Sequence, residues 1–463
     1  MTALAQAKQA LTDALGDERV RDGDSERDLH AGDFSFHPPH RPDLVVYPGS
    51  TTEVAQVLAL ANDLRLPVTA FGAGTSLEGH VIPVNGGISL DLSRLDRILE
   101  IAPANLTATA QAGVTRLQLT RAAGEHGLFF AVDPGADATL GGMAATNAAG
   151  TTTVRYGKMR ANVLALEAVL ADGRVIRTGS RTAKTSAGYD LTSLLVGSEG
   201  TLAVITEVTV RLHAIPEHAV ALRVSFPDIE SACAAAAGMV AAGAGVTRIE
   251  LMDAWIVAAV NAYSRTSYPE GPCLLVEATG SEAVVLADLE LVQAIALAEG
   301  ATDVVYERDP DARARLWKAR HDAAHAATAM MPGTRERTTD ACVPLTALAG
   351  AATFARSEID RLGLSASILG HAGDGNLHVN LRVDPDDPDE MRRSDDLVHN
   401  VVADALARGG TSTAEHGIGL GKIGALEAEH GDLIPLMLAI KASFDPNGIL
   451  NPGKVLPAAA PAA

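Results

Sequence analysis

The chain has 463 residues, enough for two or three domains that each have a core of their own. Its 37 Lys and Arg against 57 Asp and Glu give a formal net charge of −20, which argues against nucleic acid and membrane surfaces as partners. Three cysteines without a CxxC spacing argue against a disulfide framework, and no apolar run approaches the ~20 residues of a transmembrane segment or forms a secretory signal, so a cytoplasmic protein is expected.

Strand and helix signals alternate in the first part of the chain. Leu44–Tyr47 reads as a strand, and Ser50 with Glu53 forms a capping box that opens a helix. The apolar face of that helix consists of Val54, Val57, Leu58, Ala61 and Leu64. Val68–Phe71 returns as a second strand, and further strands are expected at 87–91, 163–170 and 202–212. The pattern predicts an α/β or α+β nucleotide-binding domain.

The composition and the spacing of apolar residues change after Ile215-Pro216, where we place a domain boundary. Ala-rich helical segments at 230–242 and 282–297 then alternate with short strands such as 273–277. Prolines and repelling carboxylates at 384–390 predict a solvated surface loop, and the segment from Pro457 to the end predicts a flexible tail.

Three stretches rich in glycine and other small residues stand out. The first, Gly72–Gly79 (GAGTSLEG), offers backbone N–H groups and the hydroxyls of Thr75 and Ser76 to a pyrophosphate. It lacks both the GxGxxG spacing and the GK[ST] of a Walker loop, so an ordinary glycine-rich turn stays an alternative. The second stretch, Asp133–Gly150, is nearly all small residues, and the third, Gly188–Ile205, leads into a strand.

Histidines and carboxylates cluster later, in GHAGDGNLHVNLR (370–382) and in TAEHGIG (413–419). A strand would direct His378, Asn380 and Arg382 to one face, and the Gly-Asp-Gly-Asn turn can fold His371 back toward His378. Two imidazoles and the carboxylate of Glu415 would form a three-ligand metal site with open positions. The alternative is a pair of hydrogen-bonded histidines near a turn.

In this order and separation, the three stretches resemble the FAD-binding domain of the vanillyl-alcohol oxidase and p-cresol methylhydroxylase superfamily. The resemblance is closest to its D-lactate and D-2-hydroxyglutarate dehydrogenase branch, which includes the flavin subunit of glycolate oxidase, and it runs from about Pro42 to Leu456, ending on Asn451-Pro-Gly-Lys454. It implies an α+β fold with a two-part FAD-binding domain and an α+β cap domain. The implied divisions are a FAD-binding domain at 1–216, a cap with the metal-binding strand at 217–410, and a segment at 411–463 that returns to the FAD domain, with the active site where cap and flavin meet.

The resemblance implies non-covalent FAD, because Thr75 or Ser76 stands where some members of the superfamily carry a histidine that bonds to the flavin. His80 is expected as a polar residue at the rim of the loop. The residues expected to contact FAD are Gly72, Gly74, Thr75, Ser76, Gly79, Pro134, Gly135, Thr139, Gly141, Gly142, Thr146, Gly150, Glu199, Gly200, Ile205 and Asn451.

The GHxGDGNxH and EHGxG motifs of this branch supply metal ligands and a base. They imply that His371, His378 and Glu415 bind a divalent ion, Zn, Mn or Fe, and that His416 is the catalytic base. Arg320, in LWKARH, matches the arginine that holds the substrate carboxylate; without the resemblance, a surface arginine on an amphipathic helix would explain it equally well. Asn380 is a further expected catalytic residue. Ala324 and Thr338, at the positions where relatives that act on diacids carry cationic or hydroxyl side chains, favour a small monocarboxylate.

The expected activity is oxidation of a D-2-hydroxy acid such as D-lactate to its 2-keto acid, with the hydride passing to FAD. The next electron acceptor is a quinone, a cytochrome or an electron-transfer protein, which could bring the protein to a membrane, and a homodimer is expected. Three alternatives stay open: a glycolate oxidase subunit that needs an iron–sulfur partner, a non-redox alkyl transferase of the ether-lipid synthase kind, and a zinc hydrolase, which leaves the glycine-rich stretches unexplained.

Overall fold

The chain divides into two units in a computed structural model that describes residues 2–458. The first unit combines 2–149, 157–215 and 415–458, and the second combines 150–156 with 216–414. Residues 150–156, which the sequence placed in the first domain, therefore belong to the second unit, and the last division falls at 414/415 rather than at 410/411. Of the tail predicted from Pro457, residues 459–463 lie outside the described part.

A small sheet in the first unit carries the first glycine-rich loop. Its strand order is β1 (Val20–Arg21), β2 (Leu44–Val46), β4 (Ile88–Asp91) and β3 (Val68–Phe71). The β2–β4 and β4–β3 pairs are parallel, so the loop at 72–79 leaves the carboxyl end of β3. This group also contains α1 (Ala3–Leu15), η1 (Asp17–Arg19) and α2 (Asp24–Leu29).

Helix α3 (Thr51–Leu64) confirms the predicted start signal in part. The Ser50 hydroxyl accepts the Glu53 N–H at 3.3 Å, and Val54, Val57, Leu58 and Ala61 are buried. The reciprocal half of the capping box is absent, because the Glu53 carboxylate accepts instead from Gly49 N and from the Arg19 guanidinium. The cap is thus one-sided, and the Glu53 carboxylate links the helix to Gly49 and Arg19 instead.

A second sheet of the first unit is antiparallel and has its own apolar core. Its strands are, in order, β5 (Ile98–Ala102), β6 (Thr107–Gln111), β10 (Val204–Arg211), β8 (Val163–Val169) and β9 (Val175–Gly179). A short pair, β7 (Leu128–Phe129) with β11 (His213–Ala214), lies in the same unit, as do η2 (Pro103–Asn105), α4 (Arg116–Gly124), α5 (Leu140–Thr146), α7 (Met159–Asn162) and α8 (Leu191–Leu195).

Helix α5 was not predicted, because its sequence, LGGMAAT, has no clear apolar stripe. The Thr139 side chain caps it by accepting the Gly142 N–H. Gly141 is fixed by packing, since a Cβ there would lie 2.6 Å from the Ala112 Cβ. Part of the second small-residue stretch is therefore a short helix pressed against β6.

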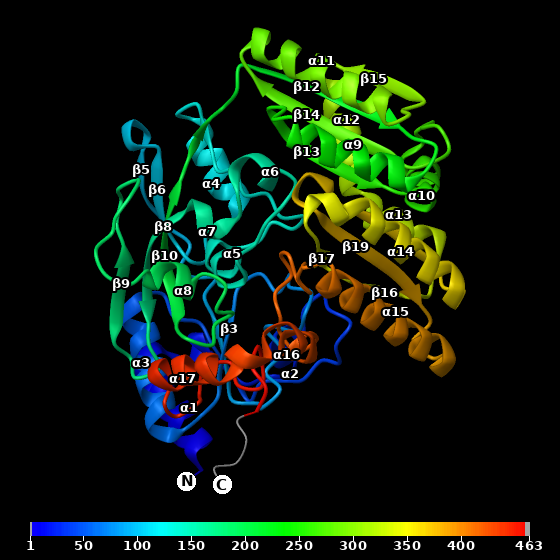
Figure 1. Ribbon diagram of the computed structural model, residues 1–463. Coiled ribbons are helices and arrows are strands. Elements are labelled where there is room, and N and C mark those ends of the chain that lie inside the picture. Colours follow the sequence, from blue (N-terminus) through cyan, green and yellow to red (C-terminus); the bar gives the residue numbers. More distant parts are fainter. Residues whose placement is uncertain (1, 459–463) are drawn as a thin grey trace. The chain divides into compact units, whose positions relative to one another are not determined.

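The end of the chain returns to the first unit as the resemblance implied (Figure 1). It contains α16 (Ile423–His430), η5 (Gly431–Leu433) and α17 (Ile434–Phe444). Leu450 forms a parallel bridge with Val68 of β3, and both Ile449 and Leu450 are buried in the core around the small sheet. Ile449 and Leu450 are therefore part of the first unit's core.

The second unit is built on one antiparallel sheet. Its path is β15 (Asp303–Glu307), β12 (His218–Ser225), β14 (Cys273–Gly280), β13 (Val246–Met252), β18 (Ala366–His371), β19 (Asn376–Val383) and β16 (Arg335–Thr338), with β17 (Ala341–Cys342) also paired to β19. One helical layer joins α10 (Ala254–Ser264), α12 (Pro310–His321) and α13 (Ala323–Met330) to the apolar side chains of the sheet. The other helices are α6 (Thr153–Tyr156), α9 (Ile229–Ala241), α11 (Glu282–Ala298), α14 (Leu348–Leu362) and α15 (Pro388–Ala407), with η3 (Leu345–Ala347) and η4 (Ala372–Asp374).

The acidic run at 384–390 is only partly the loop that was predicted. Asp387 caps α15 by accepting the N–H groups of Asp389 and Glu390, so the run ends inside the first turn of a helix. Carboxylates are favourable there because the amino end of a helix carries partial positive charge. Within residues 2–458, no helix combines the length and the apolar character needed to cross a bilayer.

Candidate active site

A hairpin of the second unit brings together the two predicted histidine ligands. Strand β18 pairs with β19 in a register that sets Leu369 opposite His378, and η4 closes the turn between the strands. The rings of His371 and His378 lie perpendicular, with centroids 5.6 Å apart. Gly375 (φ +78) has no space for a side chain, because a Cβ would lie 2.2 Å from the Val343 carbonyl oxygen. The predicted approach of the two imidazoles is confirmed.

A carboxylate that the sequence analysis missed lies behind His371. Glu250, on β13, has no exposed surface. Its Oε1 is 2.6 Å from His371 Nδ1, and its Oε2 is 2.8 Å from the Nη2 of Arg320. The arginine is therefore not a surface residue of α12, because its side chain is only 11 % exposed and faces the sheet.

A second missed carboxylate, Asp340, lies beside His378 and is also fully buried. Its Oδ1 accepts from the amide of Asn376 at 3.0 Å, and its Oδ2 accepts from the Thr413 hydroxyl at 2.7 Å. The Nδ1 of His378 is 3.7 Å from Asp340 Oδ1 and 3.2 Å from the Thr339 carbonyl oxygen. Because a carbonyl can only accept, Nδ1 of His378 carries the proton and the lone pair of the ring lies on Nε2.

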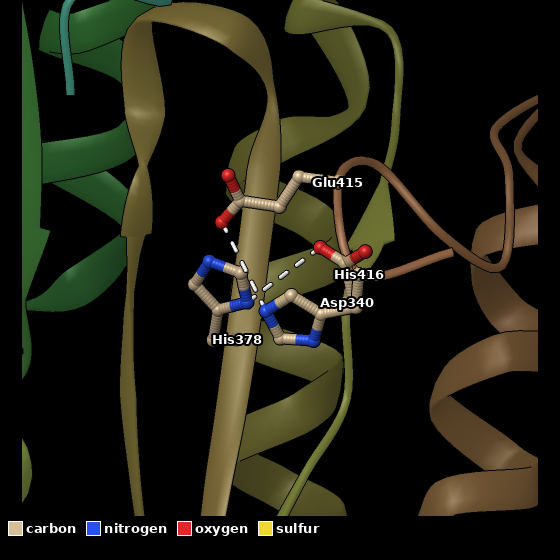
Figure 2. Close-up of side chains that lie close together, drawn as sticks. All are labelled: Asp340, His378, Glu415 and His416. Carbon is tan, nitrogen blue, oxygen red and sulfur yellow. Dashed lines mark ion pairs between the residues drawn. The ribbon is translucent and has the colours of Figure 1, made fainter. Parts of the chain in front are cut away.

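The segment that supplies Glu415 and His416 is attached to Asp340. The Ala414 N–H donates to the Asp340 carbonyl oxygen, and Glu415 and His416 follow directly in the chain. Figure 2 shows the four side chains Asp340, His378, Glu415 and His416 gathered together, with one ligand atom of each within 4.8 Å of the others. Imidazole nitrogen and carboxylate oxygen suit Zn, Mn and Fe, so these residues fit a divalent ion.

The group shares two members with the predicted ligand set. It contains His378 and Glu415 as predicted, adds Asp340, and includes His416, which was predicted as the base. His371 is outside the group. Its Nδ1 is engaged with Glu250, which is the arrangement that metal-bound histidines show when the other ring nitrogen binds the ion. Its role as a ligand stays a prediction.

Two further side chains of β19 lie on the same strand face. Asn380 Oδ1 accepts the Thr338 hydroxyl at 2.6 Å. Arg382 is buried, and its guanidinium donates to Thr334 and lies within 3.4 Å of Glu336. Arg382 is therefore held by its own strand neighbours, whereas Asn380 keeps its amide nitrogen available beyond the bond that its oxygen accepts.

In the first unit, the three glycine-rich stretches converge. A Cβ on Gly72 would lie 2.5 Å from the Thr139 hydroxyl, so the first loop passes directly against the cap of α5. The third stretch is bonded to the same helix, since Gly197 N and Glu199 N donate to the carbonyls of Ala144 and Ala145. The three stretches, far apart in the sequence, are therefore in contact through α5.

The first loop presents a run of unused donors. Among the hydrogen bonds found for residues 2–458, none is donated by the backbone N–H groups of 73–77. Consecutive free amide N–H groups form a concave site for an anion, and the amino end of α5 lies beside them. These loops therefore fit the pyrophosphate of FAD. Ser76, a predicted contact, donates its hydroxyl to Asp33 at 2.8 Å.

The other predicted FAD residues shape the same loops. Gly74, Gly79 and Gly200 have positive φ, Thr146 donates its hydroxyl to the Gly142 carbonyl, and Ile205 is buried in β10. Pro134 and Gly135 lie in the segment before α5, and Gly150 belongs to the second unit. Their contacts with FAD stay predictions.

His80 is not at the rim of the loop, as the sequence analysis expected. It is buried, and its Nε2 is 3.0 Å from the Glu199 carboxylate. Burial alone would lower the pKa of His80, but the charge of Glu199 and the hydrogen bond to it raise that pKa above its ordinary value. Burial alone would raise the pKa of Glu199, but His80 and two backbone N–H groups lower it. The pair is therefore favoured in its charged form.

The carboxylate of Glu199 also holds the loop after His416. It accepts from Ile418 N at 2.7 Å and from Gly419 N at 2.8 Å. Asn451, another predicted FAD contact, donates its amide to the carbonyls of His80 and Glu199 and accepts from Lys454. Burial lowers the pKa of Lys454 to about 7. Both Glu199 and Asn451 thus attach the C-terminal segment to the FAD domain.

Comparison with known proteins identifies the family. Residues 42–179 match the FAD binding domain family, and residues 215–455 match the family of FAD linked oxidases, C-terminal domain. The second match alone covers more than half of the chain. The chain is a FAD-linked oxidase.

Three relatives of this FAD-linked oxidase match it over nearly its whole length. A probable mitochondrial D-lactate dehydrogenase from Danio rerio is 42% identical, with 98% of this chain and 92% of the relative covered. A mitochondrial D-lactate dehydrogenase (cytochrome) from Arabidopsis thaliana is 39% identical, with 98% and 80% covered. Glycolate oxidase subunit GlcD from Bacillus subtilis is 35% identical, with 97% and 96% covered. These relatives confirm the expected branch of the superfamily.

Solved structures confirm the expected fold. This FAD-linked oxidase is similar to p-cresol methylhydroxylase with a TM-score of 0.81, at 18% identity and with 98% of this chain and 96% of the other covered. It is also similar to an alkyldihydroxyacetonephosphate synthase with a TM-score of 0.76, at 18% identity and with 97% and 84% covered. At such identity the likeness concerns the fold alone, which is the predicted α+β architecture.

Proposed function

We propose that this FAD-linked oxidase oxidises a small D-2-hydroxy acid, D-lactate above all, to the 2-keto acid with the help of a divalent metal. The observation that carries the proposal is the group of Asp340, His378, Glu415 and His416, which combines donors for a metal with an imidazole (Figure 2). The names of the Danio rerio and Arabidopsis thaliana relatives support D-lactate as the substrate.

FAD, when bound, would accept the hydride from C2 of the substrate and pass the electrons on. A divalent ion, when bound, would act as a Lewis acid that makes the substrate hydroxyl easier to deprotonate. We assign Asp340, His378 and Glu415 to the metal, with His371 as the further ligand that the sequence predicted.

His416 is assigned the role of base. It would take the proton of the substrate hydroxyl as the C2–H bond breaks. The hydroxy acid then loses one proton to His416 and one hydride to FAD, which gives the keto acid. Only the neutral imidazole can take a proton in this step, and the Glu415 carboxylate lies 3.9 Å from His416 Nε2.

Arg320 is assigned to the substrate carboxylate. Its Nη2 is paired with Glu250, while its Nε is buried and has no hydrogen-bond partner among residues 2–458. A buried donor without a partner is costly, which is the expected state of a group that waits for a ligand. A guanidinium can bind a carboxylate through two parallel hydrogen bonds.

Anaerobic reduction of the bound flavin tests the proposal. The purified protein is mixed with D-lactate, L-lactate, glycolate and D-2-hydroxyglutarate, and the flavin absorbance is followed. D-lactate should bleach it fastest and L-lactate should not bleach it. Failure of all four acids would refute the proposal and favour the alkyl transferase alternative, whose reaction needs no net reduction.

A glycolate oxidase subunit is the second candidate, because GlcD matches nearly the whole chain. Glycolate would then reduce the flavin at least as fast as D-lactate, and turnover with a dye acceptor would need a partner protein. The zinc hydrolase alternative has no support, since the FAD binding domain match covers the glycine-rich stretches at 72–79 and 133–150. A cytochrome is the proposed acceptor by the name of the Arabidopsis thaliana relative; the cytoplasmic location and the homodimer stay predictions.

A further inference from the structure

Glu250 lies at the centre of the second unit's sheet. On β13 it pairs in register with His371 of β18 on one side and with Leu275 of β14 on the other. Its side chain has no exposed surface. A carboxylate in such a place is retained only when it is paired, because burying an isolated charge costs several kcal/mol or more.

Each carboxylate oxygen of Glu250 faces a basic group of a different role, Oε1 through a hydrogen bond and Oε2 through an ion pair alone. Oε1 is 2.6 Å from Nδ1 of His371, and Oε2 is 2.8 Å from Nη2 of Arg320. The two basic side chains come from elements far apart in sequence, β18 and α12, and each is 11 % exposed. One anion thus joins the histidine assigned to the metal with the arginine assigned to the substrate.

The geometry determines what each partner can present. With Oε1 accepting the proton of Nδ1, His371 is in the tautomer that carries its lone pair on Nε2, the form in which a histidine binds an ion through that nitrogen. With Nη2 paired to Oε2, the guanidinium cannot rotate about its own axis without losing the ion pair. The Nε of Arg320, which has no partner among the described residues, is held in a fixed direction for a ligand.

A neighbouring carboxylate provides a comparison. Glu277 of β14 accepts from the indole of Trp317 at 2.8 Å and lies 3.6 Å from Arg248. Trp317 precedes Arg320 by three residues on α12, so both carboxylates attach the same face of this helix to the sheet. Only Glu250 contacts the residues assigned to metal and substrate.

We propose that Glu250 is a positioning residue that couples the substrate-carboxylate site to the metal site, an inference that rests on the proposed function. Its carboxylate determines both the tautomer of His371 and the direction of the Arg320 guanidinium. Its loss therefore weakens metal binding and substrate binding at once, while FAD binding, which involves the other unit, is unchanged.

The test compares Glu250→Gln with the matched control Glu277→Gln in the full-length flavoprotein. In Glu250→Gln a neutral amide with a single oxygen replaces two anionic acceptors, so neither His371 nor Arg320 keeps a charged partner. Affinity for Zn²⁺ or Mn²⁺ alone, measured by chelator competition, should fall by about 10- to 100-fold. The D-lactate concentration for half-maximal flavin reduction should rise by a similar factor.

The control removes another buried carboxylate, 8 % exposed against 0 % for Glu250, that contacts the same helix from the same sheet. Glu277→Gln should lower the melting temperature yet keep wild-type metal affinity and half-saturation, because it touches neither assigned residue. Glu250→Asp keeps the charge but is too short to reach both partners. It should fold, and either its metal affinity or its D-lactate affinity should lie between the values of the wild type and Glu250→Gln. If Glu250→Gln does not fold, Glu250→Asp carries the test.

The outcomes separate the two proposals. A wild type that no hydroxy acid reduces refutes the proposed function, and Glu250 is then judged by metal affinity alone. Metal affinity equal to wild type in both Glu250 variants overturns the coupling, as does a wild type that binds neither ion. Equal losses in Glu250→Gln and Glu277→Gln overturn it as well, because they would show a purely structural role.

Discussion

The loop after His416 offers the sharpest test of the first unit. Gly417 has φ +80, and a Cβ there would lie 2.6 Å from Glu199 Oε1 and 2.7 Å from His80 Nε2. Neither neighbour can move aside, because Glu199 is fixed by the N–H groups of Ile418 and Gly419. Gly417→Ala should therefore strain the backbone by about 1–2 kcal/mol and either break the buried pair or overpack it, at about 2–4 kcal/mol more.

A loss of about 3–6 kcal/mol should lower the melting temperature by at least about 6 °C for a unit of this size. Thermal unfolding followed by circular dichroism and by flavin fluorescence measures it. Gly424→Ala in α16 is the matched control, because nothing lies within 4 Å of a Cβ there, and it should leave the melting temperature unchanged or slightly raised. A melting temperature of Gly417→Ala within about 1 °C of wild type would refute the reasoning.

Four further predictions follow from the structure and the proposed function. Acid precipitation should release all flavin into the supernatant, because the first glycine-rich loop has no histidine for a covalent bond; colour in the pellet would contradict this. Arg320→Lys should raise the half-saturating D-lactate concentration at normal flavin and metal content, since a lysine keeps the charge but not the fork; an unchanged value would remove the residue from the site. Glu415→Gln should lose metal and turnover together and regain activity with excess metal. His416→Asn should keep metal and flavin but slow the reduction of the flavin by about 10²- to 10⁴-fold. Flavin reduction at the wild-type rate in His416→Asn would place the base elsewhere. The pair of His80 and Glu199 stabilises the fold only while both side chains are charged. The melting temperature should therefore fall as pH rises through the raised pKa of His80, and also as pH falls through the lowered pKa of Glu199. His80→Gln should lack the fall at alkaline pH, and a pH profile identical to that of the wild type would count against the pair.

Local patterns predicted most of the elements near the site. The strand at 68–71 and the helix after Ser50 follow from apolar periodicity and a cap, both properties of a few consecutive residues. The approach of His371 to His378 follows from the short turn between them, since an antiparallel hairpin must return the chain on itself. Such features are encoded within about twenty residues.

The parts that were missed depend on partners distant in the chain. Glu250 lies 70 positions from Arg320 and 121 from His371. The signal that could have found it is a lone glutamate inside the apolar strand VTRIELM. Asp340 depends in the same way on Thr413. His80 looked like a rim residue because its buried partner, Glu199, belongs to a different glycine-rich stretch.

The order of synthesis has a bearing on how the first unit forms. Leu450 forms a bridge with Val68 of its small sheet, and the Asn451 amide donates to the carbonyls of His80 and Glu199. The ribosome, however, must translate all of 216–414 between delivering the first part of this unit and delivering its last. At ~5–20 residues per second, that interval is on the order of ten to forty seconds. The second unit, whose two segments 150–156 and 216–414 are then complete, can thus fold while the FAD-binding half still lacks Ile449 and Leu450. Nascent chains truncated before Ile449 should therefore be incompletely folded in that half and recover it only once the C-terminal residues emerge.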